Sequence, residues 1–274
     1  MPFRSFIRLS LIFWLAVSSA MAAPEAKLWD RWLSHDSNTT LQVDHSPWSR
    51  FLSTYLVPGK DGVNRLAYGQ VAPADRLILE RYITSLTNTP VGQLNRSEQK
   101  AFWINLYNAL TVQVVLDHYP VESIRDIDIS PGFFANGPWG KKLVRIEGEA
   151  VSLDDIEHRI LRPIWKDPRI HYGVNCASIG CPNLQLQAFS AKNTDALLDK
   201  GARDYINHPR GVRVAGNRLI VSSIYDWFIE DFNGNDEGVI AHLQRYAEPD
   251  LREQLQRFNR ISDHEYDWSL NDIR

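Results

Sequence analysis

Residues 97–118, SEQKAFWINLYNALTVQVVLDH, make up the most apolar helical stretch of this chain. Asn95 precedes it as an N-cap residue and Glu98 follows three positions later, which is typical of the beginning of a helix. Pro120 marks its end, because proline cannot continue a helix. Apolar residues surround a helix drawn through this stretch almost completely. The sequence therefore predicts a central helix that is buried on all sides.

Two polar residues interrupt the apolar surface of this helix. Asn105 and Asn108 are i,i+3 neighbours and therefore share one face. A buried side-chain amide must find hydrogen-bond partners. We expect both residues either to support neighbouring loops or to line a pocket.

Shorter elements flank the central helix in the sequence. The other predicted helices are two short ones within 26–56, then Pro73 to Leu86, Ser152 to Pro163, 194–207, 223–232 and two within 236–258. The predicted strands are 63–68, a hairpin at 143–151 around Gly148, 169–175, and a hairpin at 212–221 around Gly216. Many helices with a small, mostly antiparallel sheet predict a helix-rich α+β fold.

The first 22 residues have the features of a cleavable secretory signal peptide. Arg4 and Arg8 form a short basic region, an apolar run from Leu9 to Val17 follows, and small residues lead to Ala22. The apolar run is much shorter than the roughly 20 residues that span a bilayer. We therefore expect cleavage near Ala22 and a periplasmic or secreted mature chain without membrane insertion.

The rest of the chain contains no internal repeat, low-complexity tract or long linker. We expect one domain, in which 23–96 form an N-terminal helical part, 97–232 the core and 233–274 a helical extension packed on the same domain. The leader accounts for two of the 30 basic residues and none of the 33 acidic ones, so the mature net charge is −5. This balance argues against a nucleic-acid partner or an anionic membrane surface.

The two cysteines of the chain lie close together in residues 171–184, HYGVNCASIGCPNL. Three interpretations of this segment compete. The first is structural, because two cysteines in an exported protein usually form a disulfide. A Cys176–Cys181 bridge closes a short loop and removes only roughly 2 kcal/mol of unfolded-state entropy.

The second interpretation is a nucleophilic thiol. His171 would act as a base or as an imidazolium that lowers the pKa of a cysteine, while Asn175 or another nearby amide orients its ring. Cys176 is the better candidate nucleophile and Cys181 a candidate resolving thiol. The third interpretation is a metal site, in which His171, Cys176 and Cys181 bind zinc or copper. We predict no cofactor otherwise.

Other polar residues outside this segment have simpler explanations. His158 lies among apolar residues of the predicted helix 152–163, where a histidine is more often structural than catalytic. Asp226, Glu230 and Asp231 flank an aromatic core face, so we expect their charges to face solvent. The chain has no motif of a serine hydrolase, a nucleotide-binding loop or an HExxH zinc protease.

Four blocks of the sequence, in this order and spacing, resemble one family, that of the domain of unknown function 547 (DUF547). The blocks are AFWINLYNAL, VSLDDIEHRILRP, DPRIHYGVNCASIGCPNL and SIYDWFIEDF, and together they extend from about residue 97 to residue 232. The resemblance gives weight to the residues that these blocks contain, namely Asn105, Asn108, His158, His171, Asn175, Cys176, Cys181 and Pro182. A looser similarity links the chain to papain-like and transglutaminase-like cysteine hydrolases, although Asn105 and Asn108 stand where those enzymes carry their cysteine.

Together these features predict an exported α+β protein with a catalytic site formed by Cys176, His171 and Cys181 and supported by Asn105, Asn108, Asn175 and His158. The site would act on a thiol, thioester or amide of a small molecule or peptide. The alternatives are a non-catalytic binding domain with a structural disulfide, and a metal-binding site. The sequence does not decide whether the protein is an enzyme.

Overall fold

The computed structural model describes residues 24–132 and 136–273. The predicted signal peptide lies outside the described residues. Within those two ranges, no helix combines the length and the apolar character that crossing a bilayer requires.

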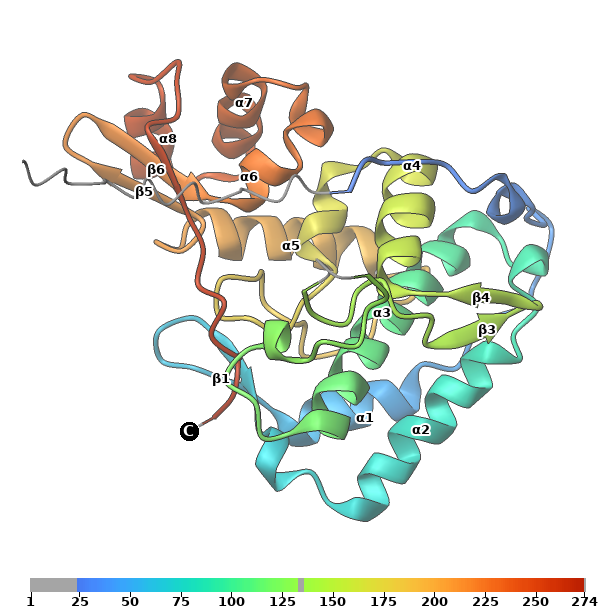
Figure 1. The fold of residues 1–274 in the computed structure, drawn as a ribbon. Helices are drawn as coiled ribbons and strands as arrows, with labels where there is room; N and C mark the ends of the chain where they lie inside the picture. The colour runs from blue at the N-terminus through green and yellow to red at the C-terminus, as the bar shows by residue number, and fades with distance from the viewer. Residues whose placement is uncertain (1–23, 133–135, 274) are drawn as a thin grey trace, which may run out of the picture.

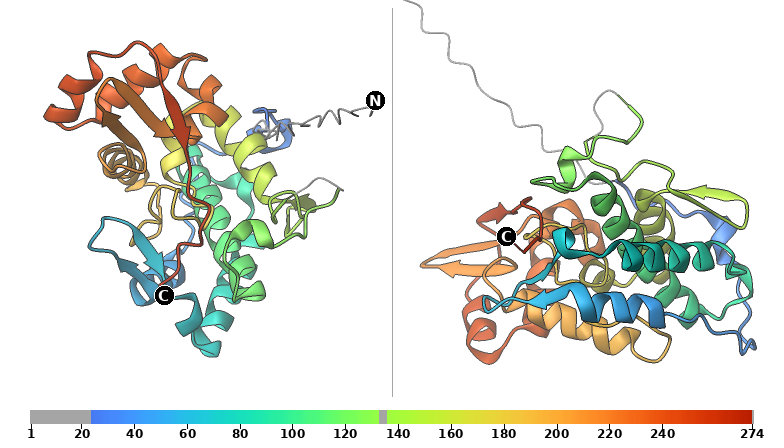
Figure 2. Two further views of the ribbon diagram at one scale, coloured as in Figure 1. Left: turned by 60° about the vertical axis from the view of Figure 1, so that its left-hand side comes forward. Right: turned by 90° about the horizontal axis from the view of Figure 1, so that it is seen from below.

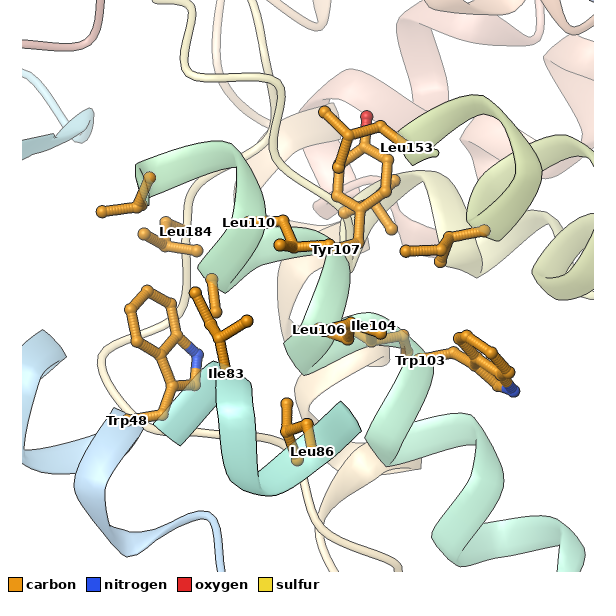
Figure 3. Packing of buried hydrophobic residues seen from close by; sticks show 14 of the residues in the cluster. Trp48, Ile83, Leu86, Trp103, Ile104, Leu106, Tyr107, Leu110, Leu153 and Leu184 are labelled. Carbon is orange, nitrogen blue, oxygen red and sulfur yellow. The ribbon is translucent and has the colours of Figure 1, made fainter. Parts of the chain in front are cut away.

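The central helix of the sequence prediction is confirmed as α3 (Arg96–His118), which runs through the middle of the molecule (Figure 1). The side chain of Asn95 accepts hydrogen bonds from the backbone N–H groups of Ser97 and Glu98 and caps the first turn. Nearly all of the helix is buried. Figure 3 shows Trp103, Leu106, Tyr107 and Leu110 of α3 packed with side chains of the surrounding elements, among them Trp48, Ile83, Leu153 and Leu184.

The fold is a helix-rich α+β fold, as predicted. The other α-helices are α1 (Ser46–Tyr55), α2 (Pro73–Thr87), α4 (Arg162–Trp165), α5 (Thr194–Ile206), α6 (Ile224–Trp227), α7 (Asp236–Tyr246) and α8 (Pro249–Leu255). Short 3-10 turns cover Asp30–Leu33, Tyr68–Gln70, Val91–Gln93, Ile124–Asp126, Pro168–Tyr172 and Ile229–Phe232. The strands are β1 (Leu56–Pro58), β2 (Asn64–Leu66), β3 (Val144–Ile146), β4 (Glu149–Val151), β5 (Val212–Ala215), β6 (Arg218–Ser222) and β7 (Asp263–Glu265).

The strands form three small sheets. The pairs β1–β2, β3–β4 and β5–β6 are antiparallel hairpins, and β7 joins β6 in parallel. Positive φ angles at Glu147 and Gly148 form the predicted turn between β3 and β4. The predicted strand at 63–68 is thus the second strand of the hairpin β1–β2.

Buried apolar residues form two clusters. The larger cluster surrounds α3 and includes side chains of α1, α2 and the helix that begins after Ser152. The smaller cluster joins Tyr172 and α5 to β6 and α7. In Figure 1 the elements of the second cluster gather at the top of the molecule, above α3.

The C-terminal tail connects these two regions. It leaves β7 beside β6, and in Figure 1 and the left view of Figure 2 it runs down the molecule to the β1–β2 hairpin. Isolated bridges pair Leu270 with Ser178 and Asp272 with Leu66. The backbone of Gly180 donates a hydrogen bond to the carbonyl of Asp267 (2.8 Å). The tail therefore packs directly against the loop that carries both cysteines, which we call the cysteine loop.

The predicted strand at 169–175 is wrong. Pro168–Tyr172 is a 3-10 turn, in which the side chain of Asp167 caps the N–H of Arg169. An aspartate before a proline is a strong helix start, because the proline has the helical φ angle and needs no donor. Ile170, His171 and Tyr172 are all buried, so the alternation in the sequence does not separate a core face from a solvent face.

The helix that begins at Ser152 is longer than predicted. The hydroxyl of Ser152 accepts a hydrogen bond from the N–H of Asp155, and the Asp155 carboxylate accepts one from the N–H of Ser152, which confirms the capping box. The helix does not end at Pro163. It is a π-helix over Asp155–Leu161 and then continues as α4, which contains Pro163.

Pro163 explains the π-helix. In a regular α-helix its ring would collide with the carbonyl of Arg159, and it has no N–H to donate to that carbonyl. The wider π-helix relieves the collision and frees carbonyl groups from the helical pattern. The carbonyls of His158 and Arg159 accept hydrogen bonds from the N–H groups of Lys27 (2.9 Å) and Trp29 (3.0 Å). The N-terminal segment thus provides hydrogen-bond donors for carbonyl groups that the π-helix leaves free.

The predicted helix at 223–232 is divided in two. Phe228 leaves the helical conformation, with φ of −115° and ψ of 30°, between α6 and the turn Ile229–Phe232. This break places its ring in a stack on the imidazole of His171, with the ring centres 4.3 Å apart.

Candidate active site

A cavity of about 540 Å³ lies beside the cysteine loop. Its size is within the range of small-molecule sites. The walls come from the π-helix, the cysteine loop, α6, residues of the stretches 125–131 and 136–140, and the C-terminal tail. The polar lining residues include Arg125, Asp154, Glu157, His158, His171, Cys176 and Cys181, and the aromatic ones include Tyr107, Trp139, Trp227, Phe228, Tyr266 and Trp268.

The two thiols lie together at one end of this cavity. The sulfur of Cys176 is 3.1 Å from the sulfur of Cys181, and the backbone N–H of Cys176 donates to the Cys181 sulfur (3.0 Å). The hydroxyl groups of Ser178 and Tyr266 lie 3.2 Å and 3.1 Å from the Cys176 sulfur. We call these four residues the cysteine end of the cavity.

Amide side chains hold the cysteine loop in place through hydrogen bonds to its backbone. Asn108 of α3 donates to the carbonyl of Gly173 (2.8 Å) and accepts from the N–H of Asn175 (2.8 Å). Asn175 in turn donates to the carbonyl of Pro182 (2.7 Å) and accepts from the N–H of Ala177 (2.9 Å). These bonds fix the chain on both sides of the cysteines.

The backbone is strained directly after Cys176. Ala177 has a φ of +59°, a left-handed conformation that residues other than glycine adopt at a cost. Its N–H is bonded to Asn175, and its carbonyl accepts a hydrogen bond from the N–H of Asn271 (3.1 Å). The surrounding hydrogen bonds therefore hold the strained residue in place, as is common at functional sites.

The two cysteines differ in acidity. Hydrogen bonding from the Cys181 thiol lowers the pKa of Cys176 against the effect of burial, and the hydroxyls of Ser178 and Tyr266 lower it further. Burial raises the pKa of Cys181 well above its ordinary value, and the neighbouring Cys176 raises it further. Cys176 is thus the residue on which the geometry favours a thiolate.

A cluster of ionisable side chains also borders the cavity, where Glu157, His158 and His171 belong to its lining. His171 Nε2 is 2.7 Å from a carboxylate oxygen of Asp231, and its Nδ1 is 3.7 Å from the carboxylate of Glu157. Arg162 donates to the same oxygen of Asp231 (2.6 Å) and to Nδ1 of His158 (3.1 Å). We call these five residues the charged end.

The charged end contains ionised groups in spite of its burial. Burial opposes a charge on His171, but hydrogen bonds to Asp231 and Glu157 outweigh it and raise the pKa of His171. Burial likewise opposes a charge on Glu157, yet His158, His171 and Arg162 together lower its pKa to about 2. Burial lowers the pKa of His158 to about 4. The cluster thus combines a stabilised imidazolium with a neutral histidine.

The structure places the three predicted catalytic residues around one cavity but pairs them differently from the expected arrangement. His171, Cys176 and Cys181 all line the cavity. Both ring nitrogens of His171 face carboxylates, and among the described residues no histidine forms a hydrogen bond with either sulfur. The catalytic roles of these residues stay predictions.

The supporting asparagines act as loop supports. Asn108 and Asn175 hold the cysteine loop, whereas Asn105 donates to the carbonyl of Phe189 (2.8 Å) and accepts from its N–H (2.9 Å). Neither Asn105 nor Asn108 lines the cavity. His158, which the sequence suggested to be structural, lines the cavity from the π-helix.

Several site residues escaped the sequence prediction. The expectation that Asp231 faces solvent is wrong, because its carboxylate binds both Arg162 and His171. Asp231 is the second-to-last residue of the block SIYDWFIEDF, which is the signal that was available for it. Tyr266 and Trp268 lie in the C-terminal tail, and nothing in their local sequence indicates that the tail returns to the cysteine loop.

The disulfide interpretation of the cysteines does not match the geometry. A disulfide has a sulfur–sulfur distance of about 2.05 Å, whereas these sulfurs are 3.1 Å apart and both thiols are free. Within the described residues, no three side chains of histidine, cysteine, aspartate or glutamate are arranged to hold a metal ion. The binding of zinc or copper by His171, Cys176 and Cys181 stays a prediction.

Comparison with known proteins agrees with the resemblance in the sequence. Neither the curated proteins nor the solved structures gave a match. The family model described as "Protein of unknown function, DUF547" matches residues 91–206, which include α3, the π-helix and the cysteine loop. Residues 91–206 of this chain are therefore similar to the DUF547 family.

Proposed function

We propose that the protein is an exported enzyme in which Cys176 is a nucleophilic thiol. Its substrate would be a small molecule or peptide held in the 540 Å³ cavity, with a disulfide, thioester or amide presented to the sulfur. The observation that carries this proposal is the cysteine end itself. Three groups that can donate a hydrogen bond to a thiolate, the Cys181 thiol and the hydroxyls of Ser178 and Tyr266, surround the Cys176 sulfur and lower its pKa.

The reaction that this geometry supports best is thiol–disulfide exchange. The Cys176 thiolate attacks one sulfur of a substrate disulfide, forms a mixed disulfide and expels the other half as a thiolate. Cys181, 3.1 Å away, then loses its proton and attacks the Cys176 sulfur, which releases the second half. Two electrons pass from the dithiol to the substrate. Two molecules of an external small thiol then return the Cys176–Cys181 bridge to the dithiol and are themselves joined as a disulfide.

Acyl transfer is the second candidate, and two ionisable side chains that line the cavity, His158 and Asp154, favour it. The Cys176 thiolate would attack the carbonyl carbon of a thioester or amide and form an acyl-cysteine, while the leaving sulfur or nitrogen takes up a proton. Water would then hydrolyse the acyl-cysteine. His158 and Asp154 line the same cavity, and burial together with the charge of Glu157 raises the pKa of Asp154 to about 6. A carboxyl group with this pKa suits proton transfer near neutral pH.

Alkylation of the folded mature protein tests the proposal. We expect iodoacetamide to modify Cys176 at pH 7 faster than the same cysteine in the urea-unfolded chain, with a midpoint below the usual thiol pKa of about 8.5. Cys176→Ser should abolish this fast phase, whereas Cys181→Ser should keep it because serine still offers a hydroxyl donor. If Cys176 in the folded protein reacts no faster than in the unfolded chain, the proposal is wrong.

The Cys181→Ser variant also separates the two reactions. In disulfide exchange this variant should stop at the mixed disulfide with Cys176, which mass spectrometry detects as an adduct. In acyl transfer the same variant should continue to turn over a thioester, because the acyl-cysteine does not need Cys181. A Cys181→Ser protein that forms no adduct with a disulfide and does not turn over a thioester would contradict both.

Export follows from the predicted signal peptide. Expression of residues 1–274 in a bacterial host should yield a periplasmic protein whose N-terminal sequence begins close to Ala23. A cytoplasmic protein that retains Met1 would contradict this proposal.

A further inference from the structure

We propose that the cavity selects substrates in which an aromatic ring with an anionic substituent lies next to the reacting sulfur or carbonyl group. This inference rests on the proposed function, because it names the substrate class of the same site. Its basis is a group of aromatic side chains that the proposed chemistry does not use.

Four aromatic rings meet next to Cys176. Trp227 and Trp268 stack with ring centres 5.5 Å apart, and the ring of Tyr266 contacts both, at 4.8 Å and 4.7 Å. Trp139 meets Trp268 edge-on at 5.8 Å. We call these four residues the aromatic wall. All four line the cavity, and the hydroxyl of Tyr266 is 3.1 Å from the Cys176 sulfur.

The aromatic wall is unlike the aromatic residues of the core. Its three tryptophans are only partly buried, whereas Trp48 and Trp103 of the core are almost fully buried. Partly exposed indole rings that converge on a cavity leave π faces and edges for a ligand. Because Tyr266 belongs both to the wall and to the cysteine end, a ring bound against the wall lies within reach of the thiol.

The charge of the substituent follows from Arg125. Its guanidinium lies over the ring of Trp268, 5.3 Å from the ring centre, and the residue lines the cavity. A guanidinium next to an aromatic face binds a carboxylate in the plane of a ligand ring, because the fork of N–H donors matches the two oxygens. The acidic residues Asp154 and Glu157 line the cavity from the π-helix instead. The wall and Arg125 therefore favour an aromatic carboxylate.

Three disulfides of graded chemistry test this inference. Dithiobis(nitrobenzoate) is aromatic and anionic, dithiodipyridine is aromatic and uncharged, and bis(hydroxyethyl) disulfide has no ring. Each rate with Cys176 is divided by the rate of the same reagent with free cysteine, which removes intrinsic reactivity. We expect the normalised rate for dithiobis(nitrobenzoate) to exceed that of the aliphatic disulfide about tenfold.

Two variants and a matched control locate the effect. Trp268→Leu should remove most of the preference for both aromatic disulfides, and Arg125→Met should slow only the anionic one. Trp165→Leu is the control, because Trp165 is also partly buried beside a guanidinium, that of Arg96, but lies outside the cavity lining. Equal normalised rates for all three disulfides would overturn the inference and leave the reactive thiol of the proposed function intact.

Binding without chemistry provides the independent arm. In Cys176→Ser, nitrobenzoate should quench tryptophan fluorescence and bind more tightly than cyclohexanecarboxylate or benzylamine, and Trp268→Leu should abolish the difference. This result with a wild-type thiol that reacts with no disulfide or thioester would support the substrate class and contradict the proposed function. Tighter binding of benzylamine would show that Asp154 and Glu157 select the ligand, which would overturn the inference.

Discussion

The cysteine end and the charged end of the cavity are built from different interactions. At the cysteine end, Cys176 receives only neutral partners, the thiol of Cys181 and two hydroxyl groups. At the charged end, His171 and Arg162 share the carboxylate of Asp231 at 2.7 Å and 2.6 Å. One end stabilises a charge that appears on a thiol, while the other end holds charges that are already compensated.

This difference indicates a division of work between the two ends. Neutral donors adjust the acidity of Cys176 without neutralising its thiolate, so the sulfur stays nucleophilic. Paired charges in a buried site are costly to separate, so the charged end is rigid and supports one wall of the cavity. Each end also takes one partner from beyond the family match at 91–206, namely Tyr266 and Asp231. The C-terminal third of the chain therefore completes the site.

Breaking the charged end should have the largest effect on stability. Asp231→Asn leaves Arg162 and His171 without their shared carboxylate, and we expect a loss of about 3 kcal/mol in the free energy of unfolding. Urea denaturation measures this loss. The control is Asp263→Asn in the exposed pair with Arg218, also 2.7 Å long, where we expect less than about 0.5 kcal/mol. Similar losses in both variants would show that the charged end contributes no more to stability than an exposed ion pair.

The same variant has a pH signature. The pKa of His171 is raised in the folded protein, so the stability that its charge contributes is complete below its ordinary value of about 6.5. That contribution is lost as the pH rises through the raised pKa. The destabilisation by Asp231→Asn should therefore be larger at pH 6 than at pH 9. The opposite trend would mean that His171 is neutral in the folded protein.

The two amide supports of α3 offer a sharper contrast. Asn108→Ala removes the bonds to Gly173 and Asn175 and leaves two buried backbone groups unsatisfied, so we expect a loss of about 2 kcal/mol. Asn105→Ala removes the two equivalent bonds to Phe189 and should cost a similar amount. Only Asn108→Ala should also slow the alkylation of Cys176, because only this residue holds the cysteine loop. Equal alkylation rates in the two variants would contradict this assignment.

Local sequence signals were sufficient for most of the fold. The N-cap at Asn95, the capping box at Ser152 and the turn at Gly148 are interactions between neighbours in the sequence, and all three are confirmed. The errors arise where packing decides. Residues 169–175 alternate like a strand, but burial on every side and the Asp167–Pro168 start favour a 3-10 turn. Pro163 was expected to end a helix that widens around it instead.

Less of the candidate site than of the fold could be predicted from the sequence. Cys176 and Cys181 are unusual residues in one short segment, so composition was enough to select them. The distance between His171 and its partners depends on how α6 and the following turn pack, which no local pattern encodes. Asp231 and Tyr266 reach the site from sequence separations of 60 and 90 residues, to His171 and Cys176 respectively. Such contacts depend on the tertiary fold.

The cysteine end can be weakened one donor at a time. Tyr266→Phe keeps the ring of the aromatic wall and removes the hydroxyl that lies 3.1 Å from the Cys176 sulfur. We expect the pKa of Cys176 to rise and its alkylation at pH 7 to slow about fivefold, with little change at pH 10, where the thiolate forms anyway. Tyr225→Phe is the control, because the hydroxyl of Tyr225 contacts Tyr172 and neither sulfur. A slower reaction at every pH would indicate a packing defect instead.

The smallest effect concerns two adjacent acids at the beginning of the π-helix. Burial, with Glu157 and Asp155 nearby, raises the pKa of Asp154 to about 6, whereas hydrogen bonds to Asp155 overcome its burial and lower its pKa. Ionised Asp154 therefore opposes folding as the pH rises from about 4 to about 6, and ionised Asp155 favours folding above about 4.

Asp154→Asn should raise the melting temperature slightly at pH 7 and leave it unchanged at pH 4. Asp155→Asn should lower the melting temperature at pH 7, because it removes partners of Ser152 and Arg159. If the melting temperature of Asp154→Asn does not rise at either pH, burial does not destabilise the ionised form of this carboxyl group. Asp154 would then be excluded as the proton-transferring acid of the acyl-transfer reaction.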